Sequence, residues 1–208
     1  DVAATRSPLT SLEFATLRVK DAVCDRFRAD LNVRPSIDKR LPDVRVHAYL
    51  TDREASLYID TSGEPLFKRG YRRDTDEAPL RENLAAGLLA LAGWTPDVPF
   101  LDPMCGSGTI AVEAALIAAD RAPGLARTFG FQKLAWFDGP AWQRMKQTAR
   151  DRIRTASAAP ALFARDLSPG AVAKAQSNLR AAQVDGFVAV EQADFLARPA
   201  PALHGVLL

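Results

Sequence analysis

Residues 101–110, with the sequence LDPMCGSGTI, constrain the fold more than any other segment of this 208-residue chain. A short apolar run ends at Asp102, a loop containing Gly106 and Gly108 follows, and an apolar, helix-like pattern begins directly after the loop. Glycine permits a positive φ and lets the backbone approach a ligand closely. The N-terminus of a helix offers unpaired N–H groups to a carboxylate or a phosphate. The segment therefore predicts a strand–loop–helix unit of an α/β protein, with a ligand site at the loop.

The same order of elements recurs along the rest of the chain. Strands are expected at residues 99–102, 161–164, 187–190 and 206–208, and a helix that Pro79 opens is expected at residues 80–93. Ser168 and Pro169 are suited to the N-cap and first turn of a helix that runs to Gln183. Alternating strands and helices predict a parallel sheet with helices on both faces. Residues 121–159 form an insertion rich in aromatic and basic residues.

The first sixty residues lack this order and predict a separate, small α+β module. A helix is expected at residues 11–31 with Ser11 as its cap, and strands at 44–50 and 55–59 are joined by a hairpin loop at 51–54. Gly63 and Pro65 then mark a boundary. We therefore expect one module over residues 1–63, a basic linker over 64–78 and a second domain over 79–208.

The glycine loop discriminates between classes of ligand. A P-loop needs a lysine after its last glycine, and no lysine follows Gly108 at that spacing. A dinucleotide fingerprint needs a third glycine where Ala111 stands, although some dinucleotide sites accept alanine there, so this class stays open. The pattern Asp-x-x-x-Gly-x-Gly fits better the loop that holds the amino-acid end of S-adenosylmethionine in methyltransferases.

Two further acids support this interpretation. Asp166 stands at the end of the second strand, where its carboxylate can accept hydrogen bonds from both ribose hydroxyls. Asp194 follows the third strand, where it can accept a hydrogen bond from the adenine amino group. Each acid alone would also fit an ordinary aspartate at the start of a loop. The ordered set of three, together with the glycine loop, favours a cofactor site.

Composition indicates the cellular compartment of the protein but not its function. The 27 basic and 25 acidic residues leave a net charge of +2, which neither favours nor excludes a nucleic-acid partner. The two cysteines, Cys24 and Cys105, lie far apart and fit neither a disulfide framework nor a metal site. No apolar run approaches the roughly 20 residues of a membrane span. We expect a soluble, cytoplasmic protein without a metal or membrane partner, and both ends of the sequence read as those of an internal fragment.

Residues 19–138 resemble the THUMP-containing RNA guanine-N2 methyltransferases, and most closely the bacterial group that acts on large-subunit (23S) ribosomal RNA. The matching runs follow the order of that family and span more than half of the chain. They are RVKDA at 18–22, DTSG at 60–63, KRGYR at 68–72, APLRENLAA at 78–86, DPMCGSGT at 102–109 and RAPGL at 121–125.

The resemblance implies that residues 1–63 are the C-terminal part of a THUMP RNA-binding domain. Residues 79–208 would be the N-terminal part of a Rossmann-like methyltransferase domain, truncated after the fourth strand. S-adenosylmethionine is the implied cofactor, and its expected binding residues are Asp102, Pro103, Cys105, Gly106, Gly108, Thr109, Asp166 and Asp194. The family places an Asn-Pro-Pro-Tyr motif directly after the fourth strand, where this sequence ends at Leu208. The catalytic residues are therefore unknown, and the fragment alone is expected to be inactive.

The implied partner is RNA, and the implied substrate is the exocyclic N2 of a guanine in large-subunit ribosomal RNA. Three alternatives remain: a transfer RNA guanine-N2 methyltransferase of the THUMP type, a non-catalytic RNA-binding module, and a nicotinamide-dependent oxidoreductase. Within the basic linker, Lys68, Arg69, Tyr71 and Arg72 are candidates for RNA contact, although a solvated linker explains them equally well.

Overall fold

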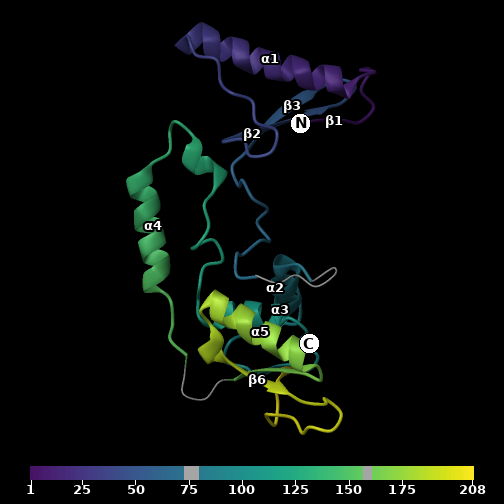
Figure 1. Cartoon of the computed structure of the whole chain (residues 1–208), viewed down its shortest axis with the longest axis vertical. Coiled ribbons are helices and arrows are strands. Elements are labelled where there is room, and N and C mark those ends of the chain that lie inside the picture. The colour runs from purple at the N-terminus through teal and green to yellow at the C-terminus, as the bar shows by residue number, and fades with distance from the viewer. Residues whose placement is uncertain (73–79, 157–160) are drawn as a thin grey trace. The chain divides into compact units, whose positions relative to one another are not determined.

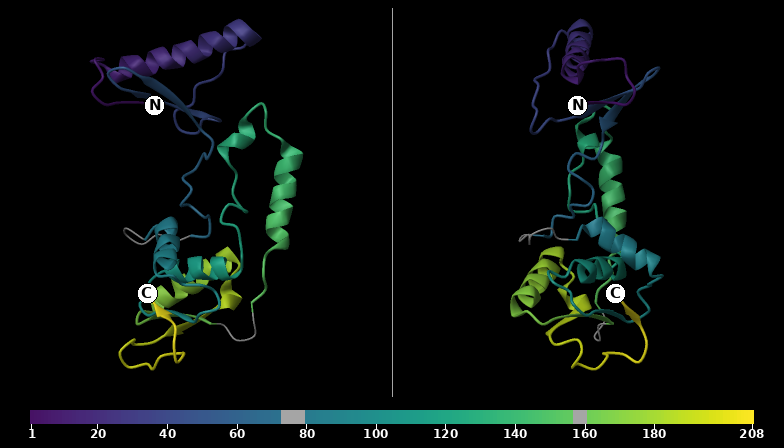
Figure 2. Two further views of the ribbon diagram at one scale, coloured as in Figure 1. Left: turned by 180° about the vertical axis from the view of Figure 1, so that it is seen from behind. Right: turned by 90° about the vertical axis from the view of Figure 1, so that its right-hand side faces the viewer.

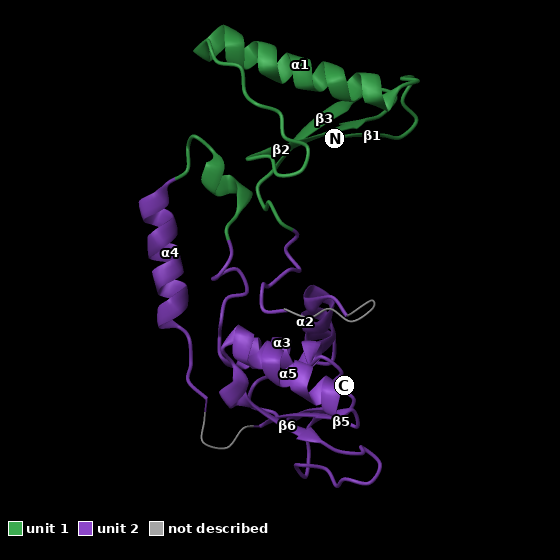
Figure 3. Cartoon of the chain, viewed as in Figure 1, with its two compact units in different colours: residues 1–64, 128–137 green, residues 65–127, 138–208 purple. Residues whose placement is uncertain are grey.

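The computed structural model describes residues 1–72, 80–156 and 161–208 (Figure 1). They form two compact units (Figure 3). Unit 1 comprises residues 1–64 and 128–137, and unit 2 comprises residues 65–127 and 138–208. The segment 128–137, which we expected inside the second domain, therefore belongs to unit 1.

Unit 1 pairs a long helix with a small sheet. Helix α1 (Leu12–Leu31) begins where the Ser11 hydroxyl accepts a hydrogen bond from the Phe14 N–H, and it ends at Asn32 in the left-handed conformation. Strands β1 (Val2–Ala4), β2 (Arg45–Leu50) and β3 (Ala55–Asp60) form the sheet in the order β1-β2-β3. The helix and the β2–β3 hairpin were predicted. Strand β1 was not, because three residues are too few to show an alternating pattern.

The segment 128–137 packs against the end of β3. It contains a short 3-10 helix, Gly130–Lys133, whose Phe131 N–H donates to the Thr61 carbonyl at 2.9 Å. The Lys133 ammonium lies 2.7 Å from the Asp43 carboxylate, and the rings of Phe129 and Phe131 stack at 5.2 Å. Aromatic residues of the predicted insertion therefore anchor its segment 128–137 within unit 1. Helix α4 (Gly139–Asp151) follows, capped by Asp138.

Unit 2 is built on a parallel sheet of β4 (Phe100–Asp102), β5 (Leu162–Asp166), β6 (Val188–Gln192) and β7 (Val206–Leu207). The order is β6-β5-β4-β7, and every neighbouring pair is parallel. The chain leaves β4 toward β5 and β6 and later returns to the other side of β4 with β7, which creates the switch point typical of doubly wound folds. The predicted α/β fold class is confirmed.

Two helices pack on this sheet, and a third packs on one of them. Helices α3 (Thr109–Ala118) and α5 (Pro169–Ala182) connect β4, β5 and β6 and lie on the same face (Figure 2). Helix α2 (Glu82–Leu91) packs against α3 and is shorter than the predicted 80–93, while Pro79 lies outside the described residues. The core between these elements includes the almost fully buried Phe100, Leu89, Leu179, Val112 and Val184.

The connection from β6 to β7 is irregular. Residues 193–205, which return the chain from β6 to β7, contain turns and bends but no helix. Pro199 and Pro201 disfavour a helix in this segment, because proline removes a backbone donor and clashes with the preceding helical turn. Among the helices of the described ranges, none is both long and apolar enough to cross a membrane.

Candidate functional site

The glycine loop after β4 has the geometry that the sequence predicted. Gly106 and Gly108 have φ values of +53° and +79°, in the left-handed region that favours glycine. A Cβ on Gly108 would lie 2.8 Å from the Cβ of Ala175 on α5, so the close approach of loop and helix also requires glycine. Gly108 is the N-cap residue of α3 and has no side chain to cap it. The first turn of α3 can therefore offer its N–H groups to a ligand.

Asp166 joins this loop to the end of β5. One carboxylate oxygen accepts a hydrogen bond from the Gly106 N–H at 2.9 Å, and the other accepts one from the Ser168 N–H at 2.9 Å. The Cys105 N–H donates to the Arg165 carbonyl at 2.8 Å and adds a second link between the two strand ends. Asp166 is half-buried, and each carboxylate oxygen has a second lone pair. The residue can therefore hold the loop and still accept a hydrogen bond from a ligand.

Asp102 lies deeper, with only 4% of its surface exposed. Its pKa is raised to about 7, mainly by burial; a hydrogen bond from the Met104 N–H lowers this pKa, and the nearby charge of Asp166 adds to the increase. A carboxyl group with such a pKa is partly protonated at neutral pH. A cationic ligand nearby would favour its ionised form.

Three more of the predicted loop residues lie behind the loop surface. Pro103, Cys105 and Thr109 are buried. Burial raises the pKa of the Cys105 thiol to about 12, so it stays protonated and is a packing residue rather than a nucleophile. The Thr109 hydroxyl accepts a hydrogen bond from Arg72 at 2.9 Å. For all three, the side chain supports the loop from inside.

Asp194 follows β6 in a tight turn. Its carboxylate accepts a hydrogen bond from the Leu196 N–H at 2.9 Å, and the residue is exposed. Because β4, β5 and β6 are parallel neighbours, Asp102, Asp166 and Asp194 follow the carboxyl ends of three adjacent strands. The structure thus places the three predicted acids along one edge of the sheet.

A set of apolar side chains at the same edge was not predicted from the sequence. Met104, Leu167 and Phe195 follow β4, β5 and β6, and their exposed fractions are 76%, 70% and 37%. Leu167 and Phe195 each stand directly after one of the predicted acids. The apolar residue directly after each of these two acids is the sequence signal that could have predicted this set. Exposed apolar groups at the edge of a sheet can contact the flat face of a heterocyclic ring.

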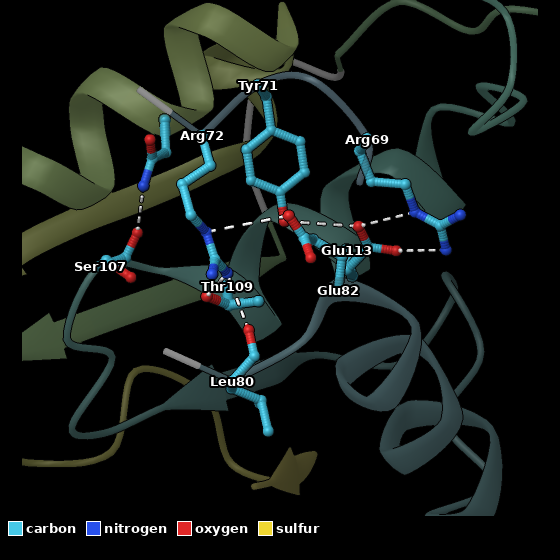
Figure 4. A network of polar contacts seen from close by, with 9 residues as sticks. Arg69, Tyr71, Arg72, Leu80, Glu82, Ser107, Thr109 and Glu113 are labelled. Atoms are coloured by element: carbon cyan, nitrogen blue, oxygen red, sulfur yellow. Dashed lines mark hydrogen bonds and ion pairs between the residues drawn. The ribbon is translucent and has the colours of Figure 1, made fainter. Parts of the chain in front are cut away.

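The basic segment before residue 73 makes polar contacts within unit 2. Arg69 and the Tyr71 hydroxyl both donate to the Glu113 carboxylate at 3.4 Å (Figure 4). Tyr71 and Glu113 are only 4% and 3% exposed, and burial is the main cause that raises the pKa of each.

Arg72 is also used internally. It donates to the Leu80 carbonyl as well as to Thr109, and it lies beside the Glu82 carboxylate (Figure 4). Arg69, Tyr71 and Arg72 therefore hold this segment against α2 and α3, and their contact with RNA stays a prediction, which this internal pairing disfavours. Of the four candidates only Lys68 is exposed. Arg73 lies outside the described residues.

Across residues 1–72, 80–156 and 161–208, no group of three or more His, Cys, Asp and Glu side chains is arranged to hold a metal ion. The groups that this edge of the sheet offers to a ligand are backbone N–H groups, carboxylates and apolar side chains. That set suits an organic cation with an amino-acid group, hydroxyls and a flat ring.

Comparisons with known proteins agree with this geometry. The chain matches the family of the RMKL-like methyltransferase domain over residues 69–203, and the THUMP domain over residues 1–60. The ribosomal RNA large subunit methyltransferase K/L of Aeromonas salmonicida (strain A449) is 41% identical over 197 residues, which cover 93% of this chain and 27% of that protein. The chain thus spans about a quarter of the length of this curated relative.

Two solved structures are similar over nearly the whole chain. SMU.472, a protein classed provisionally as a methyltransferase and solved in complex with SAH, is 32% identical with a TM-score of 0.84. A predicted N6-adenine-specific DNA methylase from Listeria monocytogenes is 31% identical with a TM-score of 0.86. Each comparison covers 99% of this chain and 55% of the solved one.

Proposed function

Since this chain belongs to the RMKL-like methyltransferase family and begins with a THUMP domain, we propose that it is the cofactor-binding part of an RNA methyltransferase that uses S-adenosylmethionine. The single observation that supports this most is the arrangement of the glycine loop, the uncapped start of α3 and three acids along one sheet edge. When bound, S-adenosylmethionine supplies an electrophilic methyl group on a positively charged sulfur.

The residues at this edge fit that cofactor. The first turn of α3 suits the carboxylate of its amino-acid end, and Asp102 and Asp166 suit its positive charges. Asp166 is proposed to accept from the ribose hydroxyls and Asp194 from the adenine amino group, with Leu167 and Phe195 beside the ring. SMU.472 was solved with SAH, the demethylated form of the same cofactor, and this supports the proposal.

We propose that the methyl acceptor is the exocyclic N2 of a guanine in large-subunit ribosomal RNA. The sequence resemblance and the curated relative named for large-subunit ribosomal RNA support this acceptor. Ribosomal RNA as substrate would also place the protein in the cytoplasm. No described residue is proposed as catalytic, because the family's acceptor motif follows the fourth strand.

Binding of SAH to the full-length protein tests the cofactor site. We expect Asp166→Ala to weaken SAH binding in calorimetry by about ten-fold or more, since the ribose hydroxyls lose their acceptor and Gly106 its anchor. Asp166→Asn keeps one acceptor oxygen and should lose less. Wild-type affinity in a folded Asp166→Ala variant would refute the assignment.

Methyl transfer tests the acceptor. Full-length protein is incubated with isotope-labelled S-adenosylmethionine and, separately, large-subunit ribosomal RNA, transfer RNA and DNA, and the nucleosides are analysed by mass spectrometry. N2-methylguanosine in ribosomal RNA is expected. The same product in transfer RNA supports the first alternative, and N6-methyladenine in DNA would match the Listeria relative instead. SAH binding without any transfer favours a non-catalytic RNA-binding module.

A further inference from the structure

Arg72 connects three separate pieces of unit 2. Its Nη2 donates to the Thr109 hydroxyl at 2.9 Å and to the Leu80 carbonyl at 2.8 Å, and its Nε lies 3.8 Å from the Glu82 carboxylate (Figure 4). Thr109 is the first residue of α3, and Glu82 is the first residue of α2. The side chain is only 10% exposed. Arg72 thus holds the beginning of both helices from inside the unit.

The contact with Thr109 lies directly behind the glycine loop. Thr109 follows Gly108, the N-cap residue without a side chain. The N–H groups of this first turn are the ones we propose to bind the carboxylate of the cofactor. A hydrogen bond that fixes the Thr109 side chain therefore also limits the movement of the N–H groups around it.

Within the part of the chain that the structure describes, the charge of Arg72 has one loosely placed counterion. Among the residues that the structure describes, its buried Nε has no hydrogen-bond partner, and the nearest carboxylate oxygen is the one of Glu82 at 3.8 Å. A guanidinium at that distance from its counterion adds positive potential to the start of α3, which already has the positive end of a helix dipole. Both effects favour an anionic group at the loop.

Arg69 provides a natural contrast in the same network. It is also a largely buried arginine, with 15% exposed, and it pairs with a carboxylate on α3. Its partner is Glu113, one turn further along the helix, and within the described ranges no hydrogen bond or ion pair joins Arg69 to Thr109 or to the loop. The two arginines thus have the same chemistry and similar burial, but only Arg72 contacts the first residue of α3.

We propose that Arg72 is a positioning residue for the amino-acid end of the cofactor, acting through its hydrogen bond to Thr109. The inference depends on the proposed use of S-adenosylmethionine and adds a residue to it that does not itself touch the ligand. A residue that acts there affects ligands with a carboxylate and spares ligands that lack one.

The experiment compares two ligands on the full-length protein by calorimetry. SAH contains the amino-acid end, and 5′-methylthioadenosine contains only the adenosine and sulfur. We expect Arg72→Met and Thr109→Val each to weaken SAH binding by about ten-fold and methylthioadenosine binding by less than about two-fold. Arg69→Met is the matched control and should leave the ratio of the two affinities unchanged. Thr109→Ser, which keeps the hydroxyl, should restore SAH binding.

The double variant separates a direct link from two independent effects. If Arg72 acts through Thr109, Arg72→Met with Thr109→Val binds SAH about as well as Arg72→Met alone. Equal losses for both ligands, an unchanged SAH affinity, or an additive double variant would overturn the proposal. If Arg72→Met does not fold, the comparison of Thr109→Val with Thr109→Ser decides. A wild-type protein that binds neither ligand would instead refute the proposed function.

Discussion

Asp102 illustrates how its surroundings change the chemistry of one residue. Asp166 and Asp102 are both aspartates at the end of a parallel strand. Asp166 is half-buried and keeps contact with solvent, whereas Asp102 is almost fully buried beneath the loop. Removing a carboxylate from water disfavours its charged form, and the negative charge of Asp166 adds to this effect. Asp102 can therefore respond to the positive charge of a cofactor by losing a proton.

This difference predicts a pH dependence of stability. The pKa of Asp102 rises from 3.8 to about 7 in the folded protein, so the folded state binds the proton more tightly than the unfolded state. The contribution of Asp102 to stability is therefore largest below about pH 4 and is lost as the pH rises toward 7. Asp102→Asn removes this loss and should become more stable than the wild type by up to about 4 kcal/mol between pH 5 and pH 8, at 1.36 kcal/mol per pKa unit.

Denaturant titrations of both proteins at several pH values measure the effect. The difference between variant and wild type isolates Asp102 from the other groups that titrate. If the two curves stay parallel from pH 5 to pH 8, the pKa of Asp102 is not raised.

At the scale of elements, helix α5 holds the glycine loop from the side. The buried Asn178 donates from its amide to the Ser107 carbonyl at 2.9 Å, one helical turn beyond the contact of Ala175 with Gly108. The loop is thus enclosed by α5 on one side and by the end of β5 on the other. Its conformation depends on the packing of two elements that are distant in sequence.

Loss of the Asn178 amide should therefore affect both stability and binding. We expect Asn178→Ala to lower the free energy of unfolding by about 1–3 kcal/mol, since the Ser107 carbonyl loses its partner. SAH affinity should fall as well, because the loop becomes less ordered. Arg180→Ala, at an exposed position of the same helix, should change neither quantity. Asn178→Ala with wild-type stability would show that the bond contributes nothing.

Local signals allowed the prediction of most elements but not of the contacts between them. The caps Ser11 and Ser168 and the apolar strand runs depend on neighbouring residues, and these predictions are confirmed. The contact of Asp166 with Gly106 spans 60 positions, and that of Asn178 with Ser107 spans 71. Similarly, KRGYR reads as a solvated linker until the buried Glu113 and Glu82 are known to lie beside it. Such contacts follow from packing, which periodicity does not specify.

At the scale of the whole molecule, the chain passes between the two units three times. It leaves unit 1 after residue 64, returns for residues 128–137 and then completes unit 2. Gly130 makes the return contact possible, because a Cβ at this position would lie 2.9 Å from the Asp60 carbonyl and 3.2 Å from the Gly63 N–H. Residues 128–137, which lie between two segments of unit 2 in the sequence, thus become part of unit 1 through the close approach of the Gly130 backbone to residues 60–63.

A matched pair of glycine substitutions tests this arrangement. Gly130→Ala should destabilise unit 1 by about 1–3 kcal/mol and increase proteolysis within residues 128–137, since the backbone of β3's end must shift. Gly87→Ala introduces the same methyl group in α2, where nothing lies within 4 Å, and should stabilise the protein by up to about 1 kcal/mol.

SAH affinity should stay within about two-fold of wild type in both variants, because all residues proposed to bind the cofactor belong to unit 2. A large loss of SAH affinity in Gly130→Ala alone would mean that the returning segment transmits its strain to the cofactor site, and the two units could then not be treated as energetically independent.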